Sequence, residues 1–126
     1  AFATATETDA RGRAMVALRE AMAAHPEMVA GEGRSCTELM RAMEGVSIKT
    51  GAEAVFVAMI PAKGLGVALK IADGATRASE AAIVAILSRL GVLDPQHPAA
   101  LKRLGAPLRN WRGTAWGELR LSDGFR

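Results

Sequence analysis

Three strand-like runs that follow one another without an intervening helix constrain the fold of this chain most. The first run alternates apolar and polar residues, and the second is apolar on both faces. Gly51 separates the first two runs, and the turn 61–64, Pro-Ala-Lys-Gly, separates the last two. Strands joined by such short connections pair antiparallel, because a parallel crossover needs a dozen or more residues. The runs occupy residues 46–50, 53–60 and 65–72.

Helical patterns flank these strands on both sides. Apolar residues recur at helical spacing, and Ser35 and Glu38 form a capping box that predicts Ser35 as the N-cap of the second helix. Because strands are grouped and helices lie before and after them, we expect an α+β fold, an antiparallel sheet packed by helices. The apolar middle strand predicts helices on both faces. The helices are expected at residues 8–24, 35–43 and 76–90.

Length and composition exclude several classes of protein. The 126 residues fit a single α+β domain, residues 1–126, ending in an irregular basic tail at 95–126. No apolar run approaches the roughly 18 residues that span a membrane. The net charge of +3, from 16 basic and 13 acidic residues, is weak support for a polyanionic partner. A single cysteine rules out an internal disulfide and predicts a reducing, cytoplasmic location.

The tripeptide Lys49-Thr50-Gly51 is the main candidate for chemistry, because it ends a strand that a hairpin follows. Lys-Thr-Gly is one signature of active-site-serine enzymes that recognise penicillin, in which it lies on an edge strand lining the cleft. There the lysine supplies positive charge and the glycine leaves room for substrate against the backbone. A strand lysine without this context is most commonly solvated.

Longer blocks carry a more specific resemblance. In order and spacing they resemble the C-terminal part of the asparaginase II family, the L-asparaginases with a serine β-lactamase-like fold, from about Phe2 to Glu118. The similar blocks are His25-Pro26-Glu27-Met28-Val29-Ala30-Gly31, Arg34-Ser35-Cys36-Thr37-Glu38-Leu39-Met40-Arg41, Lys49-Thr50-Gly51-Ala52-Glu53-Ala54-Val55-Phe56, Gly64-Leu65-Gly66-Val67-Ala68-Leu69-Lys70-Ile71, Asp73-Gly74-Ala75-Thr76-Arg77-Ala78 and Asn110-Trp111-Arg112-Gly113.

The resemblance implies a hydrolase that converts L-asparagine into L-aspartate and ammonia. Family members carry two neighbouring Ser-Lys pairs, with lysine acting as base toward serine, and the lysine of the Lys-Thr-Gly motif corresponds to Lys49. Thr50 and Gly51 are then expected to contact substrate. The resemblance also implies zinc beside the site, with Cys36 as one ligand and a second cysteine and a lysine from an earlier segment.

Two departures from the family pattern qualify this expectation. No serine in the 126 residues is followed three positions later by lysine, and the Ser-Gly-Lys-His block is absent. We therefore expect this chain to be the C-terminal portion of a longer enzyme and to be inactive by itself. Ala54 stands where the family has glycine, which we expect to narrow the space behind the strand.

Two alternatives from other classes remain open at this point. The chain could be a stand-alone, non-catalytic binding module, or a structural remnant that associates with itself or with the earlier segment through an exposed sheet edge. Cys36 alone would be read as a small buried hydrophobe. We interpret the tail as a solvated surface with two anchoring tryptophans, so nucleic acid is not an expected partner. Its residues are Lys102, Arg103, Arg109, Arg112 and Arg120, with Trp111 and Trp116 between them.

Overall fold

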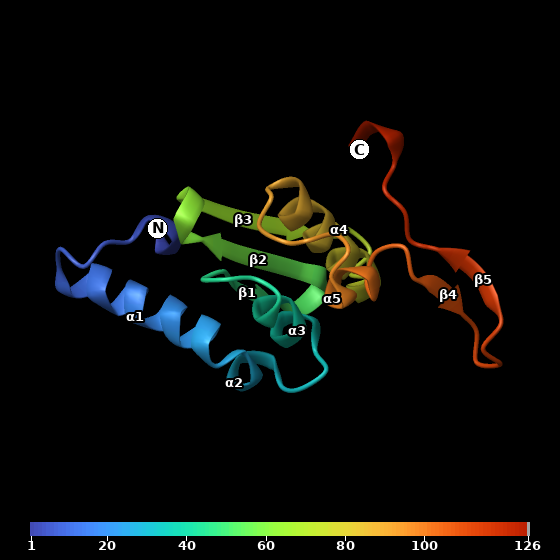
Figure 1. Cartoon of the computed structure of the whole chain (residues 1–126), viewed down its shortest axis with the longest axis horizontal. Helices are drawn as coiled ribbons and strands as arrows, with labels where there is room; N and C mark the ends of the chain where they lie inside the picture. Colours follow the sequence, from blue (N-terminus) through green and yellow to red (C-terminus); the bar gives the residue numbers. More distant parts are fainter. Residues whose placement is uncertain (126) are drawn as a thin grey trace.

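The computed structural model describes residues 1–125 as a three-stranded sheet, five α-helices and a separate two-stranded hairpin (Figure 1). Four short 3-10 helices, labelled η, connect these elements. In chain order the elements are η1 Phe2–Thr4, α1 Ala10–Ala24, α2 Pro26–Ala30, α3 Ser35–Arg41, β1 Ser47–Thr50, η2 Ala52–Ala54, β2 Val55–Ile60, η3 Pro61–Lys63, β3 Leu65–Lys70, α4 Thr76–Arg89, α5 Pro98–Leu101, β4 Pro107–Arg109, β5 Ala115–Glu118 and η4 Asp123–Phe125.

The main sheet has the predicted organisation. Its strand order is β1-β2-β3, and both pairings are antiparallel. Lys49 lies opposite Val57, which in turn lies opposite Ala68. The α+β class and the three consecutive strands are therefore confirmed, whereas the likeness to the serine β-lactamase fold stays a prediction. No helix within residues 1–125 is long and apolar enough to cross a membrane.

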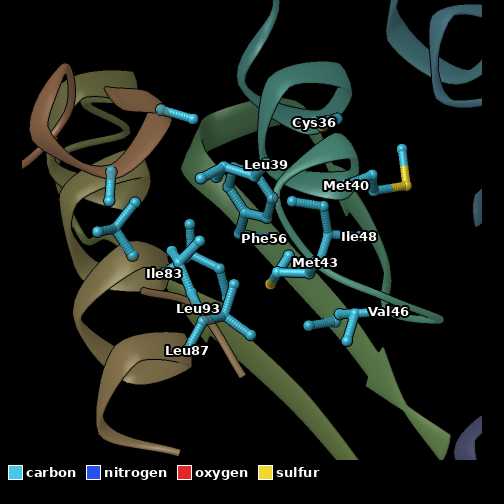
Figure 2. Packing of buried hydrophobic residues seen from close by; sticks show 14 of the residues in the cluster. Cys36, Leu39, Met40, Met43, Val46, Ile48, Phe56, Ile83, Leu87 and Leu93 are labelled. Atoms are coloured by element: carbon cyan, nitrogen blue, oxygen red, sulfur yellow. The ribbon is translucent and has the colours of Figure 1, made fainter. Parts of the chain in front are cut away.

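One face of the sheet forms the core. Side chains alternate between faces along a strand, so Ile48 of β1 and Phe56 of β2 point the same way. Both are fully buried, as are Leu39 of α3 and Ile83 of α4. Figure 2 shows these side chains gathered between the two helices and the sheet. Burying a Phe or Leu side chain contributes about 1.5–3 kcal/mol, so this layer holds the strands and helices together.

The opposite face is covered at one end. Helix α1 packs beside β1, where the Ser47 hydroxyl donates a 2.6 Å hydrogen bond to the Arg19 carbonyl. Helix η1 packs on β2 and β3. At the other end of this face Lys49, Ala68 and Lys70 are exposed. The prediction that helices cover both faces therefore holds fully for one face and only in part for the second.

The C-terminal region differs from its prediction. Residues 95–126 were expected to be irregular, but they contain α5 and the β4–β5 hairpin, which projects from the rest of the chain in Figure 1. The expectation of two anchoring tryptophans is wrong. The Trp111 side chain is fully exposed and that of Trp116 is 70% exposed, because the thin hairpin has no layer packed on it.

Helix α3 is tied to α5 by an ion-pair cluster that replaces the predicted capping box. Arg34, not Ser35, is the N-cap, and no side chain caps it. Glu38 instead accepts hydrogen bonds from Lys102 Nζ at 2.8 Å and Arg103 Nη2 at 2.5 Å. The Lys102 hydrogen bond, followed by that of Arg103, holds the pKa of Glu38 below its ordinary value. Arg103 is almost completely buried, and Glu38 is the nearer of its two carboxylate partners, since Glu80 lies 3.8 Å from its Nε.

The Glu38 cluster predicts a pH-dependent contribution to stability. A carboxyl whose pKa is lowered in the folded state stabilises the fold above its unfolded value, ordinarily 4.5, and loses that contribution as the pH falls through the folded pKa. Glu38→Gln should cost about 1–3 kcal/mol of unfolding free energy at pH 7 and much less once the pH lies below the lowered pKa of Glu38. Urea unfolding followed by circular dichroism measures both values.

Glu32→Gln is the matched control, because the exposed Glu32, in the turn before α3, pairs with Arg41 at the end of that helix. Exposed pairs contribute about 0–1 kcal/mol, so this variant should change stability little. If Glu38→Gln lowered the unfolding free energy equally at both pH values, the charged Glu38 would not be the stabilising group.

Candidate functional site

Lys49 lies at the open end of the second sheet face. It follows Ile48, which points into the core, so alternation turns Lys49 to the other side of the sheet. The side chain is exposed, and its Nζ donates a 2.8 Å hydrogen bond to the carbonyl of Thr50. Lys49 lines none of five hollows that residues 1–125 form. The cleft expected around it stays a prediction.

Thr50 and Gly51 close the connection between β1 and β2. The Gly51 amide donates to the Val55 carbonyl at 2.8 Å, and the Thr50 hydroxyl donates to the same oxygen at 3.3 Å. A Cβ at Gly51 would lie 3.3 Å from the Val55 Cβ, a tight contact, so a glycine fits this approach best. The Thr50 hydroxyl is therefore hydrogen-bonded to the backbone within this connection.

Cys36 is close to the motif in space but lies behind it. It belongs to the first turn of α3, is fully buried, and accepts a hydrogen bond from the Thr50 amide at an N···Sγ distance of 3.2 Å. Helix α3 packs on the core face of the sheet, whereas Lys49 points to the opposite face. Cys36 therefore touches the backbone of the motif at the edge of the sheet and belongs to the core, whereas the lysine side chain points to the other face.

The described residues hold one of the zinc ligands that the resemblance implies, Cys36. Zinc is held by three or four Cys, His or carboxylate ligands, with thiols in their deprotonated form. Among residues 1–125 no three such side chains lie close enough to share a metal ion. Because the resemblance assigns the second cysteine and the lysine to an earlier segment, zinc at Cys36 stays a prediction.

The residues after the motif adopt an uncommon backbone conformation. Glu53 and Ala54 have φ values of 56° and 55°, in the left-handed region that favours glycine. For a residue with a Cβ, this conformation costs roughly 1–2 kcal/mol. It gives a direct physical reason for the glycine expected at position 54. Motif reasoning did not predict the conformation of Glu53, which has no special residue type to signal it.

Comparison with known proteins assigns the family. The family model described as L-asparaginase II matches residues 1–121. The chain belongs to the L-asparaginase II family. No curated protein matches it. The resemblance identified from the sequence blocks is confirmed, and membership of this family indicates an asparaginase-type function.

The backbone at Ala54 generates a prediction about stability. In Ala54→Gly, relief of about 1–2 kcal/mol of strain opposes the loss of a buried methyl group, about 0.8 kcal/mol, and the entropy of glycine, about 0.5–1 kcal/mol. The net change should be within about 0.5 kcal/mol. Thermal unfolding monitored by circular dichroism provides the measurement.

Ala58→Gly is the control, because Ala58 is equally buried and lies in the regular strand β2. With no strain to relieve, it should lose roughly 1.5 kcal/mol or more. Equal losses at the two positions would show that Ala54 is not strained.

Proposed function

We propose that this chain contributes the Lys-Thr-Gly strand of an L-asparaginase, which hydrolyses L-asparagine to L-aspartate and ammonia. The family match over residues 1–121 carries the proposal. The exposed Lys49 at the open end of a sheet face supports it, because substrate must reach this side chain. We further propose a cytoplasmic enzyme, consistent with one buried, unpaired cysteine.

In this mechanism Lys49 handles protons for a serine nucleophile. A neutral lysine amine accepts the serine proton as the serine oxygen attacks the side-chain amide carbon of asparagine. The lysine then returns a proton to the leaving nitrogen, which departs as ammonia, and water cleaves the resulting ester to release aspartate. The Thr50 carbonyl, which accepts a hydrogen bond from Lys49 Nζ, fixes where that amine lies.

The serine has to come from a Ser-x-x-Lys segment, because these 126 residues contain no such motif. We propose that this segment packs over the open end of the sheet face. That surface combines half-buried Val55 and Val57 with exposed Ala68 beside Lys49. Apolar side chains next to a reactive lysine suit a partner that both covers the strand and supplies the nucleophile. In its absence, the same surface is free for a second copy of the chain.

The alternative of a non-catalytic module receives less support. Two basic residues of the tail are used internally, since Lys102 and Arg103 pair with Glu38. Arg109 donates to the Gly113 carbonyl within its own hairpin. Family membership favours hydrolysis, so asparagine is the proposed substrate. We do not propose nucleic acid as a partner.

The 126-residue chain alone should release no ammonia from L-asparagine. The reason is chemical: without the Ser-x-x-Lys segment, Lys49 has no serine to activate. A coupled ammonia assay on protein of verified mass tests this, with the buffer blank as baseline. Ammonia release above the blank that disappears in Lys49→Ala would contradict the proposal that the serine comes from another segment.

When the Ser-x-x-Lys segment is present, Lys49→Ala should lower kcat by about 10²–10⁴-fold, the usual contribution of a positioned acid-base group. Lys63→Ala is the control, because Lys63 is exposed in η3 at the opposite end of the sheet from Lys49. Steady-state ammonia release should leave Lys63→Ala near the parent rate. Equal losses in both variants would refute the role of Lys49.

A further inference from the structure

The buried thiol of Cys36 occupies a specific place at the edge of the sheet. Strand β1 is an outer strand of the β1-β2-β3 order, so one row of its backbone groups faces away from β2. The Gly51 amide points toward β2 and donates to Val55. Successive amides of a strand point to opposite sides, so the Thr50 amide points outward. Its acceptor is the Cys36 sulfur at 3.2 Å.

This hydrogen bond acts on the peptide that also anchors the lysine. The Thr50 amide is held by Cys36, the Thr50 carbonyl accepts from Lys49 Nζ, and the Thr50 hydroxyl donates to Val55. A shift of Thr50 would therefore move the anchor of the Lys49 amine. Helix α3 is itself fixed in the core by Leu39, so its first turn provides a rigid support for the sulfur.

We propose that Cys36 is a positioning residue of the Lys-Thr-Gly segment, and that its sulfur serves as the hydrogen-bond acceptor of the Thr50 amide. The catalytic part of this inference rests on the proposed function, because the place of Lys49 matters to turnover only in the hydrolase.

Amide hydrogen exchange measured by NMR on the 126-residue chain tests the hydrogen bond directly. In Cys36→Ala, exchange at Thr50 should accelerate about tenfold relative to exchange at Gly51, whose acceptor is unchanged. A tenfold effect corresponds to the loss of one hydrogen bond of ordinary net strength. Cys36→Ser, which restores an acceptor, should recover most of the protection. Cys36→Val also lacks an acceptor and replaces the alanine variant if the latter unfolds.

Met40→Ala is the matched control. Met40 is buried on the same helix, so its truncation loosens the core without removing the acceptor. It should accelerate exchange at Thr50 and Gly51 together. Selective acceleration at Thr50 in Met40→Ala, or equal behaviour of the two amides in Cys36→Ala, would overturn the proposal.

Kinetics separate this inference from the proposed function. In the hydrolase completed by its Ser-x-x-Lys segment, Cys36→Ala should lower kcat about tenfold with a smaller change in KM, and Cys36→Ser should restore it. Restoration of the alanine variant by added zinc, or a kcat equal to that of the parent, would refute the positioning role. Absence of asparagine hydrolysis, with the Thr50 exchange pattern as expected, would refute the proposed function and leave the hydrogen bond intact.

Discussion

The burial of one sheet face beneath α3 and α4 is the constraint on which the rest of the structure depends. Phe56 lies in the middle strand, and Leu39 and Ile83 reach it from the two helices. Once this layer is formed, the direction of every residue in β1 is determined. Ile48 must point inward, so Lys49 must point outward. The exposure of the candidate lysine is thus a consequence of core packing.

The same layer explains why the site has two unlike sides. On the core side, the end of β1 is supported by the first turn of α3. On the other side, α1 and η1 cover only the Ser47 end, and the surface around Lys49 is open. The rigid support and the open surface meet at one strand end. This arrangement suits a residue that must be held still while a substrate or a second segment approaches it.

Local sequence patterns predicted the features that depend on periodicity and turns. Alternation along residues 46–50 and the turn at 61–64 gave the three strands, and the order of sequence blocks gave the family.

Features that depend on packing between distant segments were not predicted. The pairing of Glu38 with Arg103 joins positions 65 residues apart, so Glu38 was assigned to a cap. The hydrogen bond from Thr50 to Cys36 was missed for the same reason, since neither residue type signals it. The tryptophans of the tail were expected to anchor it because apolar rings favour burial, yet a two-stranded hairpin offers no layer in which to bury them.

The exposed hairpin also determines what optical spectroscopy of this protein reports. The chain has two tryptophans and no tyrosine, and both tryptophans, Trp111 and Trp116, lie on or beside the β4–β5 hairpin, away from the core. Their indole rings are largely surrounded by water in the folded state already. Intrinsic tryptophan fluorescence consequently reports the environment of the hairpin and responds little to the packing of Phe56 against the helices. Conversely, any molecule that covers the hairpin becomes visible in an emission spectrum that the folding of the core barely changes.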